Sequence, residues 1–200
     1  MELYDKLSNV YPADNLSIST TQTIIEETDP GAVTNEVVIE HTGTEVLKIS
    51  KNLLVEERDS IANNPHTDVC DGVIGVDVVD KFIGYFELKS ACTRGNVLKA
   101  CSQILHSYHH FWSGALKCSI DMLDYEEKGI IVTQPITDEE RVRNRKRLIR
   151  DNDRKIQFSS SRFLHNLLVG KAIVNETGMP LLYFNAGEII SLTDLLQFKI

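Results

Sequence analysis

The sequence predicts an α/β fold, with a central mixed β-sheet flanked by helices, and three observations lead to this class. Short apolar segments with β-branched and aromatic residues, typical of strands, recur along the chain. Residues 97–111 carry apolar side chains at spacings of three and four, which is typical of an amphipathic helix. That helix separates a strand that ends at Lys89 from another at 128–134, the order of a crossover unit within one sheet.

Composition fits one domain with an ordinary core. The 200 residues are 42% hydrophobic and 25% charged, which are the proportions of a globular protein. No run approaches the ~20 apolar residues of a membrane span, and the amino terminus lacks a signal-peptide pattern. We therefore expect a cytoplasmic protein with no membrane partner. The cysteines form no CxxC pair, so we expect reduced thiols rather than disulfides or a zinc site.

The most informative segment is 69–90, VCDGVIGVDVVDKFIGYFELKS, which we interpret as two apolar strands joined by a tight turn. If the turn centres on Val79, antiparallel pairing joins positions whose numbers sum to 158, so Asp71 lies opposite Glu87. Opposed residues have Cβ atoms about 4.5–5.5 Å apart, so both carboxylates would reach one divalent cation. Lys89 returns to the same face. Such a site suits an anionic phosphate and the water that attacks it. The alternative is an exposed cross-strand ion pair.

Several elements are expected before this segment. Residues 20–28 (TTQTIIEET) fit a short helix that the turn at 29–31 ends. Residues 36–40 (EVVIE) and 45–49 (EVLKI) fit the two strands of a β-hairpin with a glycine-containing loop. Residues 50–61 fit either a helix or a continued strand, and we favour the helix.

The chain after Lys89 has clear start and stop signals. Asn96 is placed to cap the amphipathic helix, and Pro135 ends the strand at 128–134. Thr137–Glu140 is a capping box that begins a further helix. The remaining expected elements are a helix at 163–169, strands at 172–174 and 181–184, and a closing helix at 191–198.

A strongly basic segment follows the capping box. From 141 to 155, eight basic residues stand against two acidic ones, a local charge of 8 − 2 = +6; because the whole chain carries −8, the remainder carries −8 − 6 = −14. Positive charge gathered in one segment of an acidic protein is typical of polyanion binding. The alternative is a solvated helix paired with acidic residues elsewhere. The nucleic-acid-binding candidates are Arg141, Arg143, Arg145, Lys146, Arg147, Arg150 and Arg154.

The pattern resembles the PD-(D/E)xK nuclease superfamily, which has the restriction-endonuclease-like fold. The resemblance rests on Asp71 in CDGVIGV, on Glu87-Leu88-Lys89 in YFELKS, and on the amphipathic helix directly after them. Cys70 stands where the motif has proline. The resemblance covers about 20–134, which would be the nuclease-like core, and 135–200 would be a C-terminal α/β extension of the same domain.

The resemblance implies a metal-dependent phosphodiesterase that uses Mg²⁺ or Mn²⁺. Asp71 and Glu87 would be metal ligands, the backbone carbonyl of Leu88 would complete the shell, and Lys89 would be the catalytic lysine. In many members a glutamate from the first helix assists the metal, a role open to Glu26 or Glu27. As a further accessory residue, Gln103 resembles the glutamine of a helix motif in one nuclease branch, although Tyr108 follows it by five positions where the motif has four.

The expected function is a Mg²⁺-dependent DNA endonuclease of a restriction, repair or phage-defence type. Enzymes that cut both strands commonly act as dimers, so we expect a homodimer with Phe111 and Trp112 at its interface; alternatively, these two residues close the core. The alternative function is a non-catalytic binding or assembly protein on the same scaffold, with a nucleic-acid or protein partner.

Overall fold

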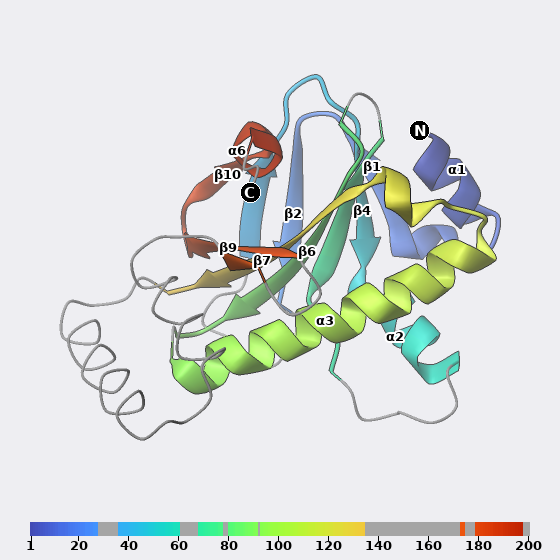
Figure 1. Ribbon diagram of the computed structural model, residues 1–200. Helices are drawn as coiled ribbons and strands as arrows, with labels where there is room; N and C mark the ends of the chain where they lie inside the picture. Colours follow the sequence, from blue (N-terminus) through green and yellow to red (C-terminus); the bar gives the residue numbers. More distant parts are fainter. Residues whose placement is uncertain are drawn as a thin grey trace.

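The computed structural model describes residues 1–27, 36–60, 68–77, 80–91, 93–134, 173–174 and 179–197 (Figure 1). Its helices are α1 (Glu2–Ser8), α2 (Lys51–Ser60), α3 (Arg94–Lys117) and α6 (Leu192–Gln197), with 3₁₀ turns η1 (Ala13–Asn15) and η2 (Met122–Asp124). Its strands are β1 (Leu16–Ser19), β2 (Gln22–Glu26), β3 (Glu36–Glu40), β4 (Val46–Ser50), β5 (Gly72–Val76), β6 (Phe82–Lys89), β7 (Glu126–Thr133), β8 (Ile173–Val174), β9 (Pro180–Asn185) and β10 (Ile189–Ser191).

A seven-stranded mixed sheet organises the molecule, with the strand order β1-β4-β5-β6-β7-β9-β8. Strands β1, β4, β5 and β6 pair antiparallel, whereas β6, β7 and β9 pair parallel. The long helix α3 is the crossover between β6 and β7, as the strand–helix–strand order predicts. A separate three-stranded sheet has the order β10-β3-β2. The predicted α/β class, with a central mixed sheet flanked by helices, is confirmed at this level.

Each face of the large sheet is covered by a different layer, because side chains alternate across a strand. Val73 and Tyr85 pack in one core with side chains of α1, α2 and α3. Ile74 and Phe86 pack in a second core with the small sheet and α6. Figure 1 shows α3 crossing the face of the large sheet. Glu87 continues the odd-numbered series of β6, so its side chain belongs to the face that α3 covers.

Two further features concern the described residues in general. Within the described ranges, no helix combines the length and the apolar character that crossing a membrane requires. Cys70, Cys101 and Cys118 are free thiols, as predicted, and Cys92 lies outside the described residues.

The predicted helix at 20–28 is wrong, because residues 22–26 form strand β2. Thr23 and Ile25 are buried while their neighbours are more exposed, which is the alternation of a strand with one covered face. The run Thr23-Ile24-Ile25 is β-branched throughout, and β-branched side chains favour extended backbone.

The predicted hairpin at 36–49 is also wrong, although both strands exist. Strand β3 pairs with β2 and β10 in the small sheet, whereas β4 pairs with β1 and β5 in the large one. The loop between them bonds to the chain before β2 instead: the His41 amide donates to Thr21 O and the Gly43 amide to Thr20 O, each at 2.9 Å. The loop therefore carries the chain from one sheet to the other.

The predictions for helices are closer to the structure. Residues 51–60 form helix α2, so the favoured interpretation of that segment is confirmed. Helix α3 is capped by Thr93 rather than Asn96, since Thr93 Oγ1 accepts from the Asn96 amide at 3.2 Å. Phe111 is fully buried in the core under α3, and Trp112 packs against that core, which confirms the alternative that these aromatics close the core.

From residue 126 onward, the described elements agree with the predictions, except that Ser191 ends strand β10 instead of beginning the closing helix. Strand β7 spans Glu126–Thr133, β9 spans Pro180–Asn185, and α6 spans Leu192–Gln197. The strand predicted at 172–174 appears as the two residues of β8. The helices predicted from 137 and at 163–169 lie outside the described residues.

Candidate metal centre

The pairing of β5 with β6 places Asp71 opposite Glu87. Gly72 pairs with Phe86 and Val73 with Tyr85, so paired positions sum to 158, which is the predicted register. Asp71 lies directly before β5, and its amide donates to the carbonyl of Phe86 at 2.9 Å. This bond continues the antiparallel pairing to the end of the sheet where Glu87 lies.

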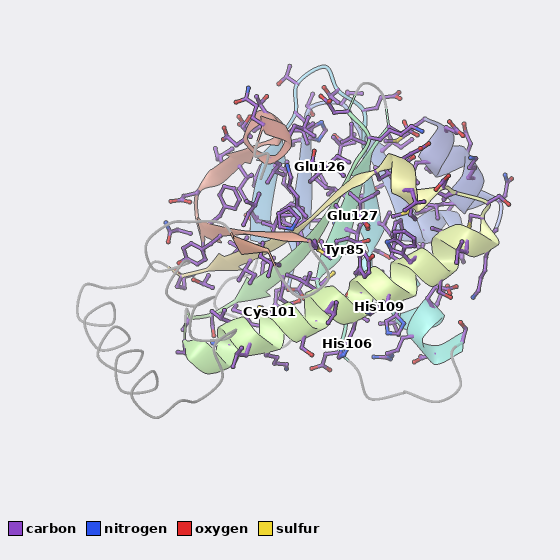
Figure 2. The ribbon with its side chains drawn as sticks, in the orientation of Figure 1. Tyr85, Cys101, His106, His109, Glu126 and Glu127 are labelled. Atoms are coloured by element: carbon purple, nitrogen blue, oxygen red, sulfur yellow. The ribbon has the colours of Figure 1, made fainter. Side chains whose placement is uncertain are left out.

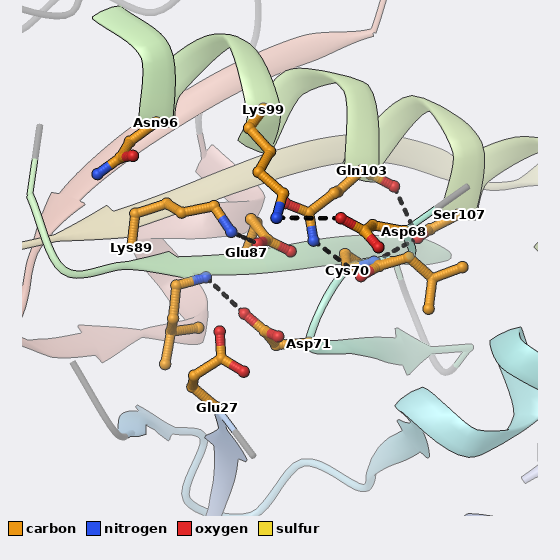
Figure 3. A network of polar contacts seen from close by, with 12 residues as sticks. Glu27, Asp68, Cys70, Asp71, Glu87, Lys89, Asn96, Lys99, Gln103 and Ser107 are labelled. Atoms are coloured by element: carbon orange, nitrogen blue, oxygen red, sulfur yellow. Dashed lines mark hydrogen bonds and ion pairs between the residues drawn. The ribbon is translucent and has the colours of Figure 1, made fainter. Parts of the chain in front are cut away.

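Three carboxylates gather at this end of the sheet (Figure 3). Glu27, Asp71 and Glu87 each present an oxygen, and these oxygens all lie within 4.8 Å of one another. Glu27 follows β2 directly, so it reaches the cluster from the small sheet rather than from a helix. Glu26, the other predicted candidate, pairs with Lys48 at 3.8 Å and is not in the cluster. We call Glu27, Asp71 and Glu87 the carboxylate cluster.

Two lysines neutralise part of this charge. Lys89 pairs with Glu87 Oε1, on the side predicted from strand alternation. Lys51, the first residue of α2, pairs with Asp71 Oδ1 at 3.0 Å and with Glu27 at 3.7 Å. No sequence motif indicated Lys51. Its one local signal is its position in the first turn of a helix. A cation there lies at the positive end of the helix dipole, which is unfavourable.

Burial makes Asp71 and Glu87 hard to ionise. Glu87 is fully buried, and burial, followed by the Asp71 charge, raises the pKa of Glu87 to about 8. Burial raises the pKa of Asp71 to about 6, although Lys51 and the Leu88 amide both lower it. Among the described residues, the lysines beside the cluster therefore leave its negative charge only partly compensated.

One oxygen of the cluster, Glu87 Oε2, is buried and accepts no hydrogen bond within the described part of the chain. Both oxygens of Asp71 are engaged, Oδ1 by Lys51 at 3.0 Å and Oδ2 by the backbone amide of Leu88 at 2.8 Å. An unpaired buried carboxylate oxygen is costly. Hard divalent cations bind carboxylate oxygens, so this donor set fits Mg²⁺ or Mn²⁺.

Leu88 and Gln103, both named from the sequence, have different contacts from those predicted. The backbone amide of Leu88 donates a hydrogen bond to Asp71 Oδ2. The metal-binding role of the Leu88 carbonyl oxygen stays a prediction. Gln103 is buried on α3 and bonds the backbone two residues before Asp71 rather than the cluster itself. Its place is that of a residue that positions Asp71.

Helix α3 fixes the segment that carries Asp71 through a row of polar side chains (Figure 3). The contacts are Ser107 Oγ accepting from the Cys70 amide (2.7 Å), Gln103 Nε2 donating to the Val69 carbonyl (3.2 Å) and Lys99 Nζ pairing with Asp68 (3.0 Å). Because these side chains come from one helix face, α3 holds the backbone of 68–70 against itself. Asp71 is thereby held at a fixed depth beside Glu87.

The predicted nucleic-acid-binding residues, from Arg141 to Arg154, lie outside the described residues, so this prediction stays a prediction. Comparison of the chain with protein-family models, with curated proteins and with solved structures finds no match in any of the three.

Proposed function

We propose that the chain is a Mg²⁺-dependent nuclease of the PD-(D/E)xK superfamily, with a restriction-endonuclease-like core, that hydrolyses phosphodiester bonds. The preferred substrate is DNA, cut by an endonuclease of a restriction, repair or phage-defence type. The observation that carries the proposal is a buried oxygen of Glu87, within a group of three carboxylates, that has no hydrogen-bond partner in the described part of the chain.

The order of elements around the cluster supports this proposal. Three antiparallel strands, β4, β5 and β6, are followed by α3 and then by the parallel strand β7. The core of the superfamily has a helix, three strands, a helix and a further strand, so the order from β4 to β7 corresponds to its part after the first helix, with α2 lying between β4 and β5. The two acidic positions and the lysine lie in β6 and directly before β5, as its motif requires.

Each residue of the site has a role in hydrolysis. Asp71, Glu87 and Glu27 would hold Mg²⁺. When bound, Mg²⁺ polarises phosphoryl oxygens and lowers the pKa of water. Lys89, beside Glu87, stabilises the negative charge that builds on the phosphate oxygens. The oxygen of water bonds to phosphorus, one P–O ester bond breaks, and the proton of the water ends on the leaving oxygen.

The basic segment supports a nucleic-acid substrate. Its charge of +6 between residues 141 and 155 contrasts with −14 over the rest of the chain. Lysine and arginine contacts to phosphates position a protein on nucleic acid without specifying sequence. We therefore expect binding that weakens strongly as salt concentration rises.

The test is incubation of the protein with plasmid DNA, single-stranded DNA and RNA, in Mg²⁺, in Mn²⁺ and in EDTA. We expect cleavage that needs the metal and that Lys89→Ala abolishes. The control is Lys81→Ala, which removes a lysine paired with Asp124 in an exposed ion pair outside the cluster. If Lys89→Ala cuts as fast as the parent, the assignment of the site is wrong. If nothing is cut and a nucleic acid or protein binds tightly, the chain is instead a non-catalytic binding protein.

A further inference from the structure

We propose that Lys51 is a second functional lysine of the site. It occupies the carboxylate cluster as an internal counter-ion, yields to the divalent cation, and then binds the phosphate that is cut. This inference rests on the proposed function, because it assumes that the cluster binds a metal ion and a phosphodiester.

Lys51 lies where a shared cation would have to bind. Its ammonium is 3.0 Å from Asp71 Oδ1 and 3.7 Å from Glu27 Oε1, so it contacts two of the three carboxylates. Asp71 Oδ2 already accepts from the Leu88 amide. A cation that binds Asp71 therefore shares Oδ1 with Lys51 or shares Oδ2 with the Leu88 amide, and in both positions it binds the carboxylate that Lys51 pairs with. An ammonium and a divalent cation at one carboxylate repel each other, so the two compete.

The net charge of the site with metal ion and phosphodiester bound indicates what Lys51 does after the metal ion displaces it. The three carboxylates and the two lysines sum to −3 + 2 = −1 when all are ionised. A divalent cation brings the sum to −1 + 2 = +1, and one phosphodiester brings it to +1 − 1 = 0. Neutrality with substrate bound thus requires both lysines to stay at the site. The phosphate is the anion that arrives as Lys51 leaves Asp71.

The two lysines differ in their freedom to move. The side chain of Lys51 is 23% exposed, and that of Lys89 is 13% exposed. Lys51 projects from the first residue of α2 on a flexible four-carbon stem, so its ammonium can leave Asp71 and remain beside the cluster. Lys89 is held on β6, next to the fully buried Glu87.

The position of Lys51 on its helix supports a role set by the site. No acidic residue lies in the first turn of α2, and Lys51 stands at the positive end of the helix dipole. A cation there is unfavourable for the helix. The attraction of Asp71 and Glu27 outweighs this unfavourable interaction with the helix dipole. Lys51 is therefore placed to serve the site and not to stabilise its helix.

The test is isothermal titration of the metal-free protein with Mn²⁺, comparing the parent with Lys51→Met and Lys51→Arg. Lys51→Met should bind Mn²⁺ roughly tenfold more tightly, because the competing charge is gone. Lys51→Arg should bind it more weakly, because a guanidinium pairs bidentately with carboxylates. The control is Lys48→Met, which removes a lysine of similar exposure (27%) that pairs with Glu26 outside the cluster, and it should bind like the parent.

A second measurement separates competition from phosphate binding. At saturating Mn²⁺, cleavage by Lys51→Met should fall roughly 10- to 100-fold in kcat/KM although the metal is bound more tightly, because one phosphate ligand is missing. If Lys51→Met binds Mn²⁺ with the affinity of the parent, Lys51 does not compete with the metal ion. If it cleaves DNA as fast as the parent, Lys51 does not bind the phosphate. If circular dichroism shows Lys51→Met to be unfolded, Lys51→Arg decides, and an unchanged affinity there overturns the inference. A parent that binds no Mn²⁺ overturns the proposed function as well.

Discussion

Glu87 and Glu57 are both buried glutamates, but they differ in the hydrogen-bond partners that the described residues supply to their carboxylate oxygens. Glu57, on α2, is 3% exposed, and each of its oxygens has a partner. Tyr11 Oη donates to Oε1 at 2.5 Å, and Lys117 Nζ donates to Oε1 at 2.9 Å and to Oε2 at 2.7 Å. Glu87 is less exposed still, with Lys89 on one oxygen and no partner for the other among the described residues.

Glu127 gives a third case that resembles Glu57. Figure 2 shows it close to Tyr85, on the neighbouring parallel strand. It accepts from Tyr85 Oη at 2.6 Å and from Trp112 Nε1 at 2.9 and 3.1 Å. The fold thus supplies donors to the buried carboxylate of Glu57 and to the half-buried carboxylate of Glu127. At Glu87 it instead brings two more carboxylates within 4.8 Å, an arrangement that either a bound cation or protonation would stabilise.

The largest expected difference between Glu87 and Glu57 is in activity. Glu87→Gln should lower metal-dependent cleavage by on the order of 10³-fold while the protein stays folded, because a metal ligand is lost and a buried charge is removed. Glu57→Gln should leave the cleavage rate of the folded protein unchanged. The measurement is DNA cleavage at fixed Mg²⁺, with circular dichroism as the control for folding. Equal losses in the two variants would show that Glu87 is no more than a structural residue.

The next difference is in the pH dependence of stability, measured by urea unfolding in EDTA. The pKa of Asp71 is raised to about 6 and that of Glu87 to about 8, so the native state binds more protons than the unfolded state between about pH 4 and pH 8. The free energy of unfolding should therefore fall as pH rises through this window, by up to ~1.4 kcal/mol per pH unit for each proton.

Glu87→Gln should flatten the upper part of that pH window, from about pH 6 to pH 8, and make the metal-free protein more stable at pH 8. Saturating Mg²⁺ should also flatten it for the parent, because a bound cation favours the ionised carboxylates. A parent whose stability rises between pH 6 and pH 8 in EDTA would be incompatible with the crowding of carboxylates described above.

A smaller effect is expected at the partner of Glu57. Lys117→Met should lower the free energy of unfolding by about 2 kcal/mol, because Glu57 Oε2 loses its donor while buried. Mn²⁺ affinity should not change, since Lys117 lies outside the carboxylate cluster. Denaturant unfolding and calorimetric titration check the two parts. A changed Mn²⁺ affinity would mean that the two buried carboxylates are coupled rather than independent.

The smallest effect is expected from the row of contacts made by α3. Ser107→Ala leaves the buried amide of Cys70 without its acceptor and should cost about 1 kcal/mol of stability. Because that amide precedes Asp71, Mn²⁺ affinity should also fall, by a few fold. The matched control is Ser102→Ala, an exposed serine on the same helix. If both serine variants bind Mn²⁺ equally well, α3 does not position Asp71.

The register of the carboxylates could be predicted because it depends on local rules. A tight turn fixes which positions oppose each other, and strand alternation fixes which face they share. The opposition of Asp71 and Glu87 followed from a turn assumed to centre on Val79, and the shared face of Lys89 followed from strand alternation; the observed pairing of Gly72 with Phe86 agrees with that register. The crossover from β6 through α3 to β7 followed in the same way from the order of elements.

The strand partners and the remaining site residues depend on which distant segments of the chain come together. The spacing of apolar residues along the sequence does not contain that information. The strands β3 and β4 look like a hairpin in sequence, but each finds its partners in a different sheet. Glu27 and Lys51 come from elements that only the tertiary fold brings to Asp71, so no spacing rule predicts their contact. The same holds for the pairing of Glu57 with Lys117 across 60 positions.

The carboxylate cluster is tested most directly by the anomalous difference map of a crystal soaked in Mn²⁺. We expect one peak that contacts carboxylate oxygens of Glu27, Asp71 and Glu87, with Lys51 moved off Asp71. The same soak of Glu87→Gln should lose the peak. A map without density at the carboxylate cluster, or with Mn²⁺ bound at Glu57 instead, would show that the cluster is not the metal site.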